Sequence, residues 1–83
     1  MVVYHLIGII VKNRKENAVK LQRILTKYGN LIRTRLGINE TKLEREHGLV
    51  IIHAEGDKDK LENMLKEINS INGLKAKMME IES

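Results

Sequence analysis

The 83-residue sequence predicts an α+β fold with the element order β-α-β-β-α-β. Two stretches place apolar side chains at helical spacing, and they lie between stretches that alternate apolar and polar residues or are dense in β-branched residues. There is no proline to interrupt these patterns, and no low-complexity run or linker divides them. We therefore expect a single domain over residues 1–83.

The first two predicted elements are a strand over residues 3–12 and a helix over residues 14–28. Asn13 precedes Glu16 by three residues, a spacing close to a capping box, so Asn13 is the expected N-cap. Gly29 is the expected C-cap. The apolar positions of the helix predict its buried face, which comprises Ala18, Leu21, Ile24, Leu25 and Tyr28.

The second strand is predicted over residues 30–38 because its side chains alternate in character. Ile32, Leu36 and Ile38 are expected to face the helices. Arg33 and Arg35 would then point to the opposite side of the sheet.

The second half of the chain repeats this pattern. Residues 39–47 are polar and are expected to form a hairpin loop or an extended ribbon, and residues 48–54 form a third strand dense in β-branched side chains. Asp57 is the expected N-cap of a helix over residues 58–70, and Asn72-Gly73 turns the chain into a strand over residues 74–81. The order predicts a ferredoxin-like sandwich, in which both helices cover one face of an antiparallel four-stranded sheet whose first and third strands are central.

The two central strands are apolar on both faces, as the runs LIGII at residues 6–10 and LVII at residues 49–52 show. Helices cover only one face, so a strip with an apolar middle and basic edges would be exposed on a monomer, and such patches mark interfaces. We expect a homo-oligomer, either a dimer or a tetramer. Arg33 and Arg35 would rim its interface and either pair with acidic residues of a second chain or frame an anion.

The net charge of +4 permits binding of nucleic acid or an anionic metabolite, but ordinary solubility charge is the favoured interpretation. Tyr4 and Tyr28 are the only aromatic side chains apart from the histidines, which disfavours base stacking on RNA. No helix-turn-helix fits the pattern, so we do not expect direct reading of DNA.

The chain has no cysteine, which excludes disulfides and thiolate metal sites and fits a reducing cytoplasm. The apolar run over residues 2–11 is shorter than the ~20 residues needed to span a bilayer, and it lacks the flanks of a signal peptide. We expect a cytoplasmic protein without a membrane association.

The turn Lys12-Asn13-Arg14 is the main candidate binding site. Backbone amides at a helix N-terminus favour an anion, and Lys12 or Arg14 could assist in holding a carboxylate or phosphate. A plain helix cap is the alternative interpretation.

The sequence supports metal binding and catalysis less well than anion binding. His5 and His53 lie on neighbouring predicted strands and could form a pair, but two histidines without a third ligand make a poor site, and His47 alone is no better. No nucleophile motif, phosphate-binding loop or dinucleotide fingerprint is present. We therefore expect no metal, no cofactor and no enzymatic activity.

Three stretches carry a family resemblance: IGIIVKNRKENAVKLQRIL, then LIRTRLGI, then INSINGLKAKMM. Together they resemble the small ACT-like regulators of the iron-only hydrogenase system over nearly the whole chain. The most telling points are the Asn13-Arg14 turn, Arg35 and Gly37 late in the second strand, and the Ile71–Leu74 turn.

The fold also resembles the effector half of nickel-responsive repressors. Those proteins place histidines at the end of the second strand and a cysteine at the start of the third. Here the corresponding residues are Leu36–Asn39 and Gly48, so the nickel ligands are missing. ACT domains bind small ligands, often amino acids, at interfaces near the first strand-helix turn.

The resemblance implies a stand-alone regulatory module, of the transcriptional regulator type, that senses a small anionic ligand at a subunit junction. It would act through a protein partner. The candidate ligand-binding residues are Lys12, Asn13, Arg14, Arg33, Arg35 and Gly37. The alternative is a nucleic-acid-binding module that uses the basic surface.

Overall fold

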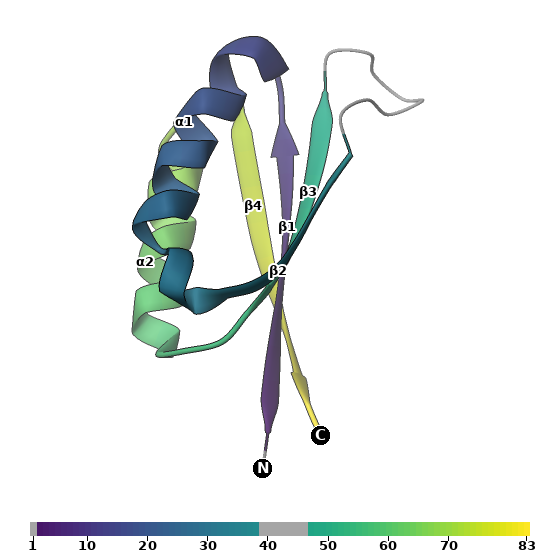
Figure 1. Ribbon diagram of the computed structural model, residues 1–83, viewed down its shortest axis with the longest axis vertical. Coiled ribbons are helices and arrows are strands. Elements are labelled where there is room, and N and C mark those ends of the chain that lie inside the picture. Colours follow the sequence, from purple (N-terminus) through teal and green to yellow (C-terminus); the bar gives the residue numbers. More distant parts are fainter. Residues whose placement is uncertain (1, 39–46) are drawn as a thin grey trace.

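The computed structural model describes residues 2–38 and 47–83 and places two α-helices against one antiparallel sheet. Along the chain the elements are β1 (Val3–Val11), α1 (Arg14–Lys27), the short 3-10 helix η1 (Gly29–Leu31), β2 (Ile32–Ile38), β3 (Gly48–Ala54), α2 (Lys58–Asn69) and β4 (Leu74–Glu82). The strand order is β2-β3-β1-β4, and both helices lie on the same side of the sheet (Figure 1). The predicted ferredoxin-like arrangement, with β1 and β3 central, is confirmed.

The predicted boundaries of the helices and strands agree with the structure to within one or two residues. The start of the second strand differs, because residues 30–31 belong to η1. The predicted loop over residues 39–47 lies outside the described residues, except for its last position. In the described parts of the chain, no helix is both long enough and apolar enough to cross a membrane.

The hydrophobic core lies between the sheet and the helices. Its fully buried large side chains are Ile7, Ile9, Leu21, Ile52, Leu61, Met64 and Ile68. On α1, Leu21 and Leu25 are buried as predicted, whereas Ala18 is exposed and Asn17 is buried instead, with 2% of its surface exposed. The Asn17 side-chain amide donates a hydrogen bond to the Lys12 carbonyl at 2.5 Å, which offsets the cost of burying a polar group.

Strand β2 contains an irregularity between Ile32 and Thr34 that reverses the faces predicted for its side chains. Ile32 pairs with the buried Ala54, as expected for a residue that faces the helices. After the irregularity, Arg35 pairs with the buried Ile52 and therefore lies on the helix side. The prediction that Arg35 points away from the helices was wrong, because one extra residue in a strand shifts all later side chains to the other face.

The same shift moves the apolar side chains of β2. Leu36 pairs with Ile51 and Ile38 pairs with Leu49, and both partners lie on the face that the helices leave uncovered. Leu36 and Ile38 were expected to face the helices, and this prediction was also wrong. They are exposed, with 55% of the surface of Leu36 open.

The two predicted helix N-caps differ in outcome. Asn13 is the N-cap residue of α1, but its backbone is left-handed (φ 50°, ψ 59°) and its side chain makes no capping hydrogen bond. A capping side chain needs an extended backbone, so the capping-box prediction was wrong. The Asp57 prediction is confirmed, since its carboxylate accepts a hydrogen bond from the Asp59 amide at 2.8 Å. At the other end of α1 the C-cap is Tyr28, and Gly29 begins η1 instead of capping the helix.

A side chain of α2 caps the outer edge of β4 at one residue, Ala76. Asn69 donates to the Ala76 carbonyl at 3.0 Å and accepts from the Ala76 amide at 2.8 Å. Its amide thus forms both bonds that a neighbouring strand would form at that residue. Because an unpaired strand edge is a template for unwanted pairing, this contact removes one such pairing position from the β4 edge.

Candidate functional site

The turn between β1 and α1 is held by a second turn that is distant in sequence. The Lys12 amide donates to the Gly73 carbonyl at 2.7 Å, while the Lys12 carbonyl accepts from Asn17. Gly73 has φ +99°, and a Cβ there would lie 2.2 Å from the Asn17 side-chain nitrogen. The turn Lys12–Arg14 is therefore fixed by a close backbone approach that only glycine permits.

Asn13 is the one described non-glycine residue with positive φ. Its carbonyl accepts hydrogen bonds from the amides of Glu16 and Asn17 at 3.0 and 3.1 Å, and α1 begins there. Asparagine tolerates the left-handed region better than most residues. The tight turn brings the positive end of the α1 dipole to the end of β1.

Arg14 and Gly37 lie at the same end of the sheet, on its helix side. A Cβ at Gly48 would lie 3.5 Å from Arg14 Cδ and 3.3 Å from the Ile38 carbonyl oxygen, so the arginine stem passes over the start of β3 beside the end of β2. Gly37 pairs with the buried Val50 and has no heavy atom within 4 Å of where its Cβ would stand. The helix side of β2 is therefore open at Gly37.

Arg35 also lies on the helix side of β2, two residues before Gly37. Its guanidinium donates to the Gln22 side-chain oxygen of α1 at 2.6 Å. Gln22 carries no sequence pattern that marks it as a partner of Arg35, and the contact follows from the reversed face of β2. Arg14, Arg35 and Gly37 therefore lie on the same side of the sheet, but Arg35 contacts α1 at Gln22, more than two helical turns from Arg14.

Arg33 lies apart from this group. Its Nε donates to a Glu55 carboxylate oxygen at 3.1 Å, and the other oxygen of Glu55 lies 3.9 Å from Nε2 of His53. The ring of His53 lies against the Tyr4 ring, with the centroids 5.8 Å apart. Arg33 thus has a carboxylate partner within its own chain, and it does not join Arg35.

The face of the sheet without helices, which we term the open face, carries apolar side chains from all four strands. Its cross-strand rows are Leu36–Ile51–Gly8–Lys77, Ile38–Leu49–Ile10–Lys75 and Thr34–His53–Leu6–Met79, followed by the pair Tyr4–Ile81. Most of these apolar side chains are exposed, including the central Ile51 at 40%. The only full charges in the rows are the lysines of β4, so the basic edge is narrower than the sequence predicted.

The two strand histidines lie on opposite faces of the sheet. His5 pairs with Ala54 and is buried on the helix side, whereas His53 pairs with Leu6 on the open face. They cannot share a ligand, and the described residues contain no cluster of three or more histidine, cysteine, aspartate or glutamate side chains that could hold a metal. Nε2 of His5 lies 3.6 Å from the Glu80 carboxylate.

Two ion pairs anchor α2 to its neighbours. Glu67 accepts hydrogen bonds from the Tyr28 hydroxyl and from Lys27 Nζ, the latter at 2.9 Å. The hydrogen bond from Tyr28, together with that from Lys27, lowers the pKa of the Glu67 carboxyl, and the same bond raises the pKa of the Tyr28 phenol. Lys58 pairs with Glu80 at 3.0 Å, and this hydrogen bond raises the pKa of the lysine.

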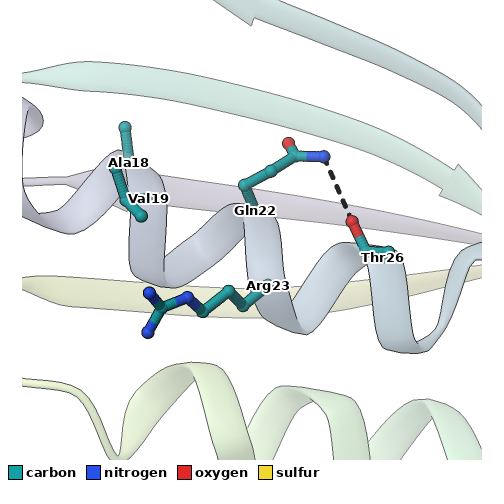
Figure 2. A pocket seen from close by; sticks show the side chains of 5 residues that line it. All are labelled: Ala18, Val19, Gln22, Arg23 and Thr26. Carbon is teal, nitrogen blue, oxygen red and sulfur yellow. Dashed lines mark hydrogen bonds between the residues drawn. The ribbon is translucent and has the colours of Figure 1, made fainter.

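A shallow groove of about 510 Å³ lies on the outer side of α1 (Figure 2). It is lined by Ala18, Val19, Gln22, Arg23 and Thr26. Gln22 donates to the Thr26 hydroxyl at 3.2 Å, and Figure 2 shows Arg23 directed toward the opposite side of the helix. The Arg35 partner Gln22 therefore also forms a wall of this groove.

Comparison with known proteins yields one family and a close fold match. Residues 4–78 match the TM1266-like family, whose description is "Iron-only hydrogenase system regulator, putative". The solved structure of the uncharacterized protein TM1266 from Thermotoga maritima superposes with a TM-score of 0.84. That match covers 95% of this chain and 96% of the other at 16% sequence identity, so it establishes the fold alone. No curated protein gives a match.

Proposed function

Because the chain belongs to the TM1266-like family of iron-only hydrogenase system regulators, we propose that it is a stand-alone regulatory module that self-associates and binds a small anion. Self-association uses the open face. The anion binds between α1 and β2, beside Arg14, Arg35 and Gly37. The module passes its state to a partner protein, since no DNA-reading motif is apparent in the sequence.

The observation that carries the proposal is the composition of the open face. Four strands spaced ~4.8 Å apart, with rows of side chains ~7 Å apart, cover roughly 500 Å². Most side chains on this face are apolar, and its polar members are Thr34, His53, Lys75 and Lys77. A patch of this size is as large as the largest on a typical monomer, and such patches are often functional. Two open faces can stack as a β-sandwich, which would bury the apolar rows of both copies.

The ligand half of the proposal is supported by charge and space. The Arg14 stem lies beside the end of β2 at the start of α1, where the positive end of the helix dipole favours a carboxylate or phosphate. Arg35 adds a second guanidinium on the same side of β2, further along α1 at Gln22. Gly37 carries no side chain on the helix side of β2, and no heavy atom lies within 4 Å of where its Cβ would stand. Lys12 and Asn13 contribute the turn that positions Arg14.

Sedimentation and native mass spectrometry test the interface. We expect the untagged chain to be a dimer or tetramer, and Ile51→Lys to dissociate it by placing a charge in the centre of the open face. Val19→Lys introduces the same charge at an exposed apolar residue of α1 and serves as the control that stays assembled. A wild-type monomer at the highest soluble concentration would refute the interface.

The same spectra test the ligand. A retained small molecule, or a rise in melting temperature with phosphate or an amino acid, is expected in the wild type and is expected to be lost in Arg35→Gln. Arg33→Gln is the matched control because Arg33 lies apart from the site and pairs with Glu55. Equal responses of the two variants would remove the ligand site and leave the interface intact.

A further inference from the structure

The outer side of α1 presents two parallel ridges. Ala18, Gln22 and Thr26 follow one another at four-residue spacing, and so do Lys15, Val19 and Arg23. The groove of about 510 Å³ lies between these ridges. Ridges at four-residue spacing, with a groove between them, are the surface against which a second helix packs.

The groove combines an apolar centre with cationic ends. Val19 has 54% of its surface exposed, more than Ile51 at the centre of the open face. Lys15 precedes it by one helical turn and Arg23 follows it by one turn. Among the described residues neither cation has an acidic partner, whereas Lys27, at the end of the same ridge, is neutralised by Glu67.

Charge selects among the possible occupants. α1 carries five basic residues and a single acidic one, Glu16, so the α1 of a second copy would set like charges against each other. A nucleic-acid backbone would match the cations but would leave Val19 against charged phosphates. An amphipathic helix with carboxylates beside its apolar stripe matches both features.

We propose that the outer groove of α1 docks an acidic amphipathic helix of a partner protein. Val19 contacts the apolar stripe of that helix, and Lys15 and Arg23 pair with its carboxylates. This docking site rests on the proposed function, in which the module acts through a partner protein. It lies on α1 and is separate from the open face. Gln22 lines the groove and also accepts the 2.6 Å hydrogen bond from Arg35. One side chain therefore connects the proposed docking surface with the proposed anion site.

Two designed helical peptides test the proposal. Both carry the same apolar stripe, flanked by glutamates in one peptide and by lysines in the other. With ¹⁵N-labelled full-length protein, we expect the glutamate peptide to shift α1 amide signals, to bind more weakly as salt is added, and to bind at least about tenfold more tightly than the lysine peptide.

Variants place the contact. Val19→Asp and Arg23→Glu are each expected to weaken the glutamate peptide by about tenfold or more. Lys60→Glu reverses a positive charge on α2, as Arg23→Glu does on α1, and is expected to leave peptide binding unchanged. The docking proposal is supported if the α1 variants lose peptide binding but keep the assembly mass of the wild type. This result does not depend on whether Ile51→Lys dissociates the assembly.

Three results would overturn it. The first is equal binding of the two peptides. The second is signal shifts confined to the open face. The third is tighter, salt-sensitive binding of duplex DNA to α1 than of the glutamate peptide, which would assign this surface to nucleic acid.

Discussion

Replacing Gly73 with alanine is expected to destabilise the fold severely, because two penalties act at one atom. The backbone there has φ +99°, a conformation that costs an L-residue about 1–2 kcal/mol. The new Cβ would stand 2.2 Å from the Asn17 side-chain nitrogen and 3.4 Å from the Lys12 carbonyl, so the buried amide must move off its hydrogen-bond acceptor. A buried donor left without a partner costs about 1–3 kcal/mol.

Together these penalties amount to about 2–5 kcal/mol, a large part of the ~5–15 kcal/mol that stabilises a typical domain. In a chain of this size each kcal/mol lowers the melting temperature by about 4–8 °C, so we expect a fall of at least about 8 °C. Gly29→Ala is the matched control. Gly29 has no atom within 4 Å of its would-be Cβ and no positive φ.

Calorimetry or urea unfolding of the two variants measures the difference, with both compared at the same protein concentration because the proposed self-association would add to apparent stability. Asn17→Ala in the Gly73→Ala background separates the clash from the backbone strain. A loss below about 1 kcal/mol in Gly73→Ala would refute the reasoning, because even the backbone penalty alone is larger.

Two further predictions concern side chains of α2. Asn69→Ala removes both hydrogen bonds to Ala76 and is expected to lower the free energy of unfolding by about 1–3 kcal/mol and to speed hydrogen exchange at the Ala76 amide. The control Asn63→Ala changes an exposed asparagine of the same helix and is expected to do neither. Normal exchange protection of the Ala76 amide in Asn69→Ala would contradict the role of Asn69 at the strand edge. Glu67 has a folded-state pKa below its ordinary value, so its contribution to stability is present above the unfolded-state pKa and is lost as the pH falls through the folded-state pKa. Urea unfolding between about pH 7 and pH 3 is expected to show less acid destabilisation in Glu67→Gln than in the wild type, and equal curves would count against the clamp with Tyr28.

The element order could be predicted from the sequence because it depends on local patterns. Alternation in β4 and helical spacing in α2 each mark a single element, and Asp57 and Gly73 mark its limits by chemistry that acts within a few residues. The ferredoxin-like topology then follows, since few sheet orders join these elements by short connections.

The side chain buried near the start of α1 could not be predicted from hydrophobicity. Ala18 fits an apolar stripe better than Asn17, yet Asn17 is the buried residue. What decides the burial is the Lys12 carbonyl, which needs a donor, together with Gly73, which admits the amide. Both are contacts between turns that are far apart in sequence, so no local pattern reports them.

The faces of β2 were mispredicted for a different reason. Alternation is a reliable guide to a strand's faces only while the pairing register holds, and the irregularity after Ile32 adds one residue. Arg33, the extra residue, is exposed, and nothing in its residue type or in its neighbours predicts a β-bulge at this position. The result is that an apolar series assigned to the core, Leu36 and Ile38, joins the open face.

This single irregularity separates the two proposed surfaces. Without it, Arg35 would stand on the open face as a charge amid apolar rows, and burying it between two copies would require a partner carboxylate. With it, the open face loses a charge and gains Leu36 and Ile38, while Arg35 meets Gln22 on α1. Self-association and anion binding can therefore occur on opposite sides of one strand, and any coupling between them passes through β2 itself.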